Sequence, residues 1–114
     1  MGLFSSLFGN SNYNNLSYEE FKQQIESDKN AVLIDVRTKE EYRQGHIPKA
    51  KNIDISSSAF PKEIEKLHNS KSYYVYCRSG ARSRSACSHM SKAGLEQVNN
   101  LSGGILSWKG KLER

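Results

Sequence analysis

The chain contains little cysteine and no long apolar run. These two shortages argue against a disulfide-rich, a zinc-binding and a membrane-spanning protein. Cys77 and Cys87, ten positions apart, are the two cysteines among its 114 residues. This pair is neither a disulfide framework nor a zinc-binding pattern, so we expect a reducing, cytoplasmic environment. No apolar stretch approaches the roughly 20 residues that cross a membrane, and we expect no transmembrane segment. A chain of this length is expected to form one domain with its own core.

The chain also lacks a long run of basic residues, although its formal net charge is +5. Its lysines and arginines are scattered, whereas nucleic-acid-binding domains gather them in a patch or stripe. We therefore expect no nucleic-acid partner, and a basic surface that attracts small anions. His68 and His89 have no metal-ligand spacing with cysteine or acidic residues, so we expect no metal site.

Apolar runs of strand length alternate with segments of helical spacing. Ser17–Glu20 and Thr38–Glu41 each have the spacing of a capping box, which marks the start of a helix. Helices are expected at 18–28, 38–45, 60–68, 82–93 and 105–112, and strands at 31–36, 52–55, 73–76 and 97–101. This alternation predicts an α/β domain over residues 16–114, in three layers, with a mostly parallel central sheet and helices on both faces. Residues 1–15 are expected to form a flexible N-terminal arm.

The most informative stretch is residues 77–83, which read Cys-Arg-Ser-Gly-Ala-Arg-Ser directly after the apolar run 73–76. In parallel sheets, active sites lie beyond the carboxyl ends of strands, and Cys77 stands at such an end. Its thiol is expected beside the positive end of a helix and beside a turn of backbone N–H groups. Arg78 and Arg82 flank the same spot. Everything local favours a thiolate, so Cys77 is the candidate catalytic nucleophile.

The residues after Cys77 are candidates for holding an anionic substrate. Their backbone N–H groups can converge on a negative charge, and the arginines add charge-assisted hydrogen bonds. The candidate substrate-binding loop consists of Arg78, Ser79, Gly80, Ala81, Arg82 and Ser83. Asp35 also follows a strand, with Arg37 two residues on; we expect this carboxylate to brace an arginine or loop amides rather than to act as a base. Cys87 is expected to pack in the core.

Four segments together resemble the single-domain rhodanese family of sulfurtransferases. They are Asp35-Val36-Arg37, the segment 41–50 with its Gly-His-Ile-Pro core, the cysteine loop 77–83, and the segment 101–108 with its Gly-Gly and Trp. The resemblance covers residues 16–112 in the family's order. Lys49 stands where the family usually has glycine, which leaves the conformation of that turn open.

The resemblance implies a rhodanese-like fold and a thiosulfate sulfurtransferase-like activity. Cys77 would attack the outer sulfur of a small anionic donor such as thiosulfate and become a persulfide. A thiol or a cyanide-like acceptor would then remove that sulfur. A partner protein that carries a persulfide is an equally compatible sulfur donor. This chemistry requires no metal or organic cofactor.

Two alternatives stay open. One is a non-enzymatic rhodanese-like module that binds or regulates a partner, although such modules usually lose the cysteine and Cys77 is present. The other is a cysteine phosphatase or arsenate reductase. Phosphatases resembling this family have five residues between cysteine and arginine, whereas four separate Cys77 from Arg82 and Arg84 lies one position too far. The shorter loop favours sulfur transfer.

Overall fold

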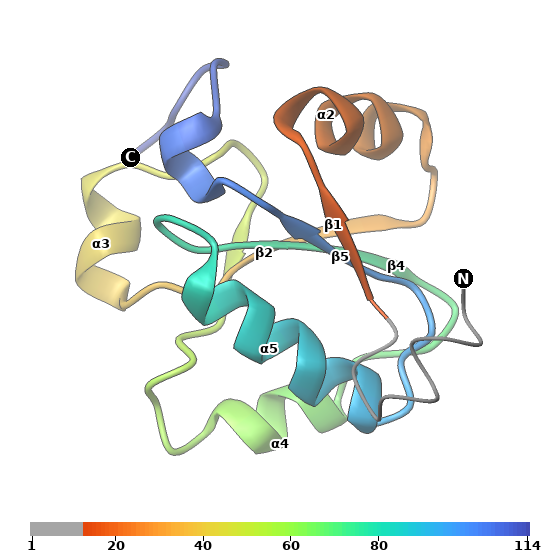
Figure 1. Cartoon of the computed structure of the whole chain (residues 1–114). Helices are drawn as coiled ribbons and strands as arrows, with labels where there is room; N and C mark the ends of the chain where they lie inside the picture. Colours follow the sequence, from red (N-terminus) through yellow and green to blue (C-terminus); the bar gives the residue numbers. More distant parts are fainter. Residues whose placement is uncertain (1–12) are drawn as a thin grey trace.

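The computed structural model describes residues 13–114, which form one five-stranded parallel sheet with helices around it (Figure 1). The strand order is β1-β5-β4-β2-β3. The strands are β1 (Asn14–Leu16), β2 (Ala31–Asp35), β3 (Lys51–Asn52), β4 (Ser72–Tyr76) and β5 (Val98–Leu101). The helices are α2 (Tyr18–Ser27), α3 (Lys39–Gln44), α4 (Phe60–Glu65), α5 (Ala81–Lys92) and a 3₁₀ turn, η1 (Gly104–Ser107). Most of the predicted arm lies outside the described residues.

The helices cover both faces of the sheet, as the alternating pattern predicts. Figure 1 shows α4 and α5 on one side of the sheet, and α2 with the C-terminal segment on the other. Strand β4 lies in the middle and is buried along its whole length. Tyr73 and Val75 enter the core beneath α4 and α5, whereas Tyr74 and Tyr76 enter the core beneath α2. Alternate side chains of one strand thus supply two cores, which confirms the three-layer α/β prediction.

Both predicted capping boxes are present. Ser17 Oγ accepts from the Glu20 N–H at 3.2 Å, and the Glu20 carboxylate accepts from the Ser17 N–H at 2.9 Å. Thr38 and Glu41 repeat the arrangement at the start of α3, at 3.2 and 3.0 Å. These reciprocal bonds satisfy N–H groups that a helix start leaves without partners, so the two helices begin where the sequence predicts.

Strand β1 begins inside the predicted arm. Asn14 and Asn15, assigned to the arm from their polarity, pair in parallel with Asn99 and Asn100 of β5. The Asn14 amide donates to Asn99 Oδ1 at 3.0 Å, and the Asn100 amide donates to Asn15 Oδ1 at 2.9 Å. Side-chain amides that bond across the strands make this polar segment a good edge strand, which composition alone cannot reveal.

The C-terminal segment forms no helix over 105–112, and that prediction is wrong. The 3₁₀ turn ends at Ser107, and the Trp108 N–H closes it on the Ile105 carbonyl at 3.0 Å. The chain then bends at Gly110, where the Trp108 indole N–H donates to the Lys111 carbonyl at 3.0 Å, and Glu113 pairs with His46 through two backbone bonds of 2.8 Å. The predicted strand 52–55 and helix 60–68 are likewise shorter, ending at Asn52 and Glu65. These ends depend on contacts distant in sequence.

The turn after His46 contains an unusual backbone conformation. Lys49 has φ +74°, and among residues 13–114 it is the one residue other than glycine with a positive φ. A side chain in this left-handed region costs about 1–2 kcal/mol, because Cβ approaches the following carbonyl oxygen. The glycine that the rhodanese pattern usually has here would avoid that cost. The turn therefore keeps a conformation that suits glycine, although a lysine occupies it.

Candidate active site

Cys77 lies where β4 ends and the loop to α5 begins, at the carboxyl edge of the sheet. The register of the sheet sets Tyr76 beside Asp35, so the ends of β4 and β2 meet there. Gly80 precedes α5 with φ +112°, a conformation that side chains rarely adopt. The sharp turn at this glycine brings Ser83, in the first turn of α5, back to the cysteine.

The Cys77 sulfur lies in a cradle of hydrogen-bond donors. The Gly80 N–H donates to Sγ at 3.1 Å, and the N–H and hydroxyl of Ser83 each lie 3.3 Å from it. Burial of the residue, 1% exposed, raises the pKa of the thiol. The hydrogen bonds from Ser83, Gly80 and Ser79 outweigh burial and hold the pKa of Cys77 below its ordinary value. The site is therefore built to stabilise a negative sulfur.

The Ser83 hydroxyl provides a direct test of that cradle. It has one proton for two acceptors, Cys77 Sγ and the Gly80 carbonyl, and a thiolate attracts it more strongly. In Ser83→Ala we expect the pKa of Cys77 to rise and its alkylation by iodoacetamide at pH 7 to slow on the order of tenfold, since a hydrogen bond to a charged group contributes about 1.5 kcal/mol or more. The measurement is alkylation rate against pH. A profile identical to that of the wild type would remove this hydroxyl from the cradle.

Two glycines, Gly80 and Gly104, allow the backbone of the cysteine loop to lie directly against that of the C-terminal segment. The Ile105 and Leu106 N–H groups donate to the carbonyls of Cys77 and Arg78 at 2.9 and 3.2 Å. A Cβ on Gly104, where φ is +65°, would overlap the Arg78 carbonyl group and the Ser79 nitrogen. A Cβ on Gly80 would overlap the Ser102 carbonyl in the same way. Gly104 and the two N–H donors that follow it thus lie directly against the cysteine loop, and we call them the floor of the loop. The Gly-Gly pattern in the sequence could not reveal this contact.

Arg82 is held by a partner that sequence reasoning missed. Its guanidinium donates to both carboxylate oxygens of Glu41, at 2.8 and 2.9 Å. The Arg82 hydrogen bonds, together with those from Thr38, outweigh partial burial and lower the pKa of Glu41 to about 2. Glu41 also caps α3, so one carboxylate joins the start of α3 to the first turn of α5. The capping signal in the sequence explains one of its roles, and the other needs the fold.

Asp35 and Arg37 form a buried ion pair beside the cysteine loop. Arg37 Nη2 donates to Asp35 Oδ2 at 2.7 Å and to the Gly45 carbonyl at 2.6 Å, and Nε donates to both carboxylate oxygens at 3.1 Å. Asp35 also accepts from the Arg37 N–H at 2.8 Å. The arginine that Asp35 braces is thus its own neighbour. The pair fixes the end of β2 against the turn that follows α3, next to the Tyr76 ring.

The six residues predicted to bind the substrate have different surroundings in the structure. Gly80 and Ser83 point donors at the sulfur, while Arg82 bonds Glu41 and the side chains of the remaining three are exposed: Arg78, Ser79 and Ala81. Within residues 13–114, no group of three or more histidine, cysteine or acidic side chains could hold a metal ion. No helix of the same range is long and apolar enough to span a bilayer.

Cys87 packs inside the core, as expected from its neighbours. It is fully buried on α5 in the cluster that contains Ala86 and Met90. Burial raises the pKa of its thiol, and the nearby Cys77 charge adds to the shift. Cys87 is therefore a poor nucleophile under conditions in which Cys77 reacts.

Cys87→Ala separates packing from reactivity. We expect the alkylation rate of Cys77 to stay within twofold of the wild type. Loss of the buried sulfur should lower stability by about 1 kcal/mol, which corresponds to a melting temperature roughly 4–8 °C lower. Thermal unfolding and alkylation rates measure the two effects. A large loss of Cys77 reactivity at an unchanged melting temperature would contradict the packing role.

Comparison with known proteins identifies the family of this fold and site. The family model of the rhodanese-like domain matches residues 17–111. The Bacillus subtilis protein YtwF is 38% identical over 96 residues, which cover 84% of this chain and 90% of that protein. A sulfurtransferase of Allochromatium vinosum is 34% identical, covering 83% of this chain and 87% of its own. The thiosulfate sulfurtransferase GlpE of Coxiella burnetii is 30% identical, with coverages of 85% and 88%.

Solved structures agree with the sequence relatives. A rhodanese-like domain protein from Staphylococcus aureus superposes with a TM-score of 0.76 at 29% identity, covering 88% of this chain and 96% of that one. A rhodanese-related protein from Thermoplasma volcanium gives 0.75 at 30% identity, with coverages of 89% and 98%. The parallel sheet, the cysteine loop at its carboxyl edge and these matches over nearly the whole described chain lead to one conclusion: the chain belongs to the rhodanese family.

Proposed function

We propose that the chain is a sulfurtransferase that carries sulfane sulfur as a persulfide on Cys77. The observation that supports this role is the convergence of the Gly80 and Ser83 donors on Sγ. Donors in this arrangement stabilise a thiolate before reaction and a negatively charged persulfide after it. The names of relatives such as the Coxiella burnetii thiosulfate sulfurtransferase support thiosulfate as a donor.

The reaction proceeds in two displacements at sulfur. The Cys77 thiolate attacks the outer sulfur of thiosulfate, the sulfur–sulfur bond of the donor breaks, and sulfite leaves with the bonding electron pair. An acceptor thiolate or cyanide then attacks the outer sulfur of the persulfide, and Cys77 returns as a thiolate with the electron pair of that bond. The two steps need no external oxidant or reductant, and they predict ping-pong kinetics.

Each part of the loop has a role in the proposed scheme. Gly80 and Ser83 hold the sulfur that reacts, while Glu41 orients the Arg82 guanidinium, whose charge also interacts with that of Cys77. Arg78 is exposed at the loop and is available to the anionic donor. The Asp35–Arg37 pair keeps the end of β2 in place beside Tyr76. A reducing, cytoplasmic environment suits two free cysteines, one of them with a lowered pKa.

Mass spectrometry of thiosulfate-treated protein tests the proposal. We expect Cys77 to gain the mass of one sulfur atom, and a thiol reductant to remove it. Assays with thiosulfate and other sulfur donors, against thiol and cyanide acceptors, then identify the productive pair. Hydrolysis of aryl phosphates is measured in parallel and is expected to be negligible. A protein that takes up no sulfur from any donor would instead be a binding module, and efficient phosphate hydrolysis dependent on Cys77 would favour the phosphatase alternative.

A further inference from the structure

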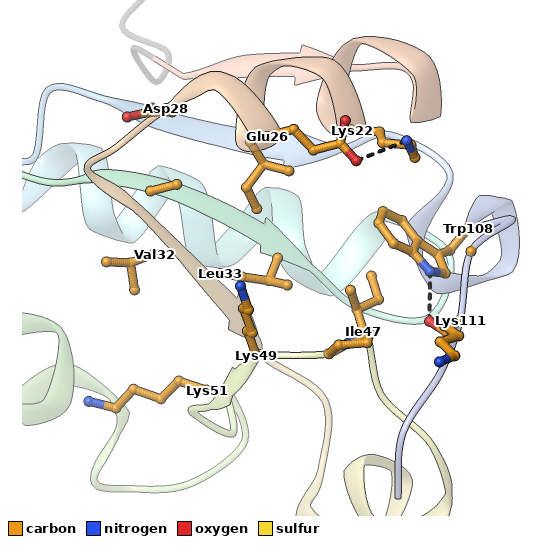
Figure 2. Close-up of a pocket in the computed structure, with 14 residues that line it drawn as sticks. Lys22, Glu26, Asp28, Val32, Leu33, Ile47, Lys49, Lys51, Trp108 and Lys111 are labelled. Carbon is orange, nitrogen blue, oxygen red and sulfur yellow. Dashed lines mark hydrogen bonds and ion pairs between the residues drawn. The ribbon is translucent and has the colours of Figure 1, made fainter.

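A groove on the α2 side of the sheet has no part in the chemistry at Cys77. It lies between α2, the turn Ile47–Lys49 and the C-terminal segment Trp108–Lys111, and we call it the α2 groove (Figure 2). Its volume is about 790 Å³. Small-molecule sites in proteins usually enclose about 300–1,000 Å³. None of the residues 77–83 lines this groove.

The wall of the α2 groove is apolar at its centre. Leu33 and Ile47 are buried beneath it, and Ile25 and Trp108 pack on the same core while remaining partly exposed. Figure 2 shows the Trp108 ring at one end, with Leu33 and Ile47 between it and the start of β2. An apolar part of a ligand would remove the exposed parts of Ile25 and Trp108 from water.

The rim of the α2 groove has an excess of positive charge. Two carboxylates line it, and both have partners: Glu26 pairs with Lys22 at 2.9 Å, and Asp28 accepts from the Tyr74 hydroxyl at 2.8 Å. Three further lysines line the groove, and none of them forms an ion pair within residues 13–114: Lys49, Lys51 and Lys111. The groove therefore presents unpaired cationic groups beside an apolar surface.

The conformation of Lys49 points to a role for its amine. Its left-handed backbone suits glycine, so the lysine is present at a cost in stability. Its side chain reaches into the open space of the groove beside Leu33 and Ile47 (Figure 2). Backbone strain lowers the stability of the fold, so a strained residue that places a charge beside an apolar surface indicates a functional role for that charge.

We propose that the α2 groove binds a small amphipathic anion. Its apolar group lies against Leu33, Ile47 and Trp108, and its carboxylate, sulfonate or phosphate group lies beside Lys49. The charge of the rim selects an anion, and the apolar wall selects an organic one over a small inorganic one. This proposal is independent of sulfur transfer, because its residues and those of the cysteine loop do not overlap.

The test uses two fluorescent probes that differ in one charge. Anilinonaphthalene sulfonate is an apolar anion, and N-phenyl-1-naphthylamine is its neutral counterpart. Trp108 is the single tryptophan of the chain and lines the groove, so quenching of its emission reports on occupancy there. We expect the full-length folded protein to bind the sulfonate probe at one site, with quenching of Trp108.

Lys49→Gly is the informative variant, because it removes the charge and the backbone strain together. We expect it to weaken binding of the sulfonate probe about fivefold, as for loss of one partly exposed ion pair. Binding of the neutral probe should stay within twofold, and the melting temperature should not fall. The control is Lys62→Ala on α4, which removes an equal charge on the opposite face of the sheet and should change neither affinity.

Several results would overturn the proposal. Absence of sulfonate binding, binding without Trp108 quenching, or equal weakening by Lys49→Gly and Lys62→Ala would each remove the site. An affinity that falls as protein concentration rises would identify a second copy of the chain as the occupant. Binding that appears only when Leu7 and Phe8 are changed to serine would identify the N-terminal residues of this chain as the occupant.

Discussion

Cys77→Ser is expected to remove sulfur transfer from thiosulfate by at least about a thousandfold, the scale seen when a covalent nucleophile is deleted. Only the sulfur carries the intermediate, so no other group of the loop can replace it. Serine is close in size, and its hydroxyl can accept the hydrogen bonds that Gly80 and Ser83 donate to Sγ. The fold should therefore persist, with a melting temperature within a few degrees of the wild type.

Steady-state transfer to cyanide, with thiosulfate as donor, measures this effect. Cys87→Ala is the matched control, because it removes the other thiol from the same helix-and-loop unit without touching the cradle. Activity above a few per cent in Cys77→Ser, with wild-type contamination excluded, would reject the persulfide mechanism. Equal losses in both variants would mean that the second thiol also takes part in the reaction.

The parts of the fold that could be predicted are those with local signals. The capping boxes at Ser17 and Thr38 need only residues three positions apart, and both helices begin where the sequence indicates. The buried strands 31–36 and 73–76 stand out because they are short apolar runs, and their observed counterparts are β2 and β4. The cysteine loop also has a local signal, since a strand, a glycine turn and a helix follow one another in the chain.

The parts that could not be predicted depend on distant contacts. Asn14 becomes a strand residue because Asn99, 85 positions away, offers backbone and amide partners. The C-terminal segment forms no helix after Ser107, because it bends back and pairs Glu113 with His46, and a helix there would break those bonds. Periodicity in a single sequence carries no information about such partners, so it assigns Asn14 and Asn15 to an arm and residues 105–112 to a helix.

The candidate site shows the same division. Cys77 and its glycine-containing loop were found from the sequence, as was the Asp35 carboxylate that braces an arginine. Because of its charge, Arg82 was expected to bind the anionic substrate or to shape the loop. The structure shows that Glu41, 41 positions earlier in the chain, sets the orientation of its guanidinium. The sequence contains Glu41 inside a recognised segment, yet it offers no signal that the carboxylate reaches a second helix.

Gly104→Ala is the second substitution that we expect to lower the rate of sulfur transfer strongly, because Gly104 lies against the backbone of the cysteine loop. An added Cβ would overlap the Arg78 carbonyl and the Ser79 nitrogen, which are backbone atoms that cannot rotate away. The loop must shift, and the donors then no longer converge on the Cys77 sulfur. Misplacement of reacting groups by about 1 Å can cost on the order of a hundredfold in rate, and we expect a loss of that size in sulfur transfer. Alkylation of Cys77 should slow as well, because its thiolate loses hydrogen bonds.

Gly94→Ala is the matched control for this prediction. Gly94 also has a positive φ, +103°, but a Cβ there meets nothing within 4 Å, and it lies at the far end of α5 from the cysteine loop. Both variants suffer the backbone strain of alanine at positive φ, and both should lose stability by about 1 kcal/mol or more. Gly104→Ala alone should lose transfer rate at a temperature where both variants remain folded. Equal rates in the two variants would show that the contact between the glycine floor and the cysteine loop does not position the reacting sulfur.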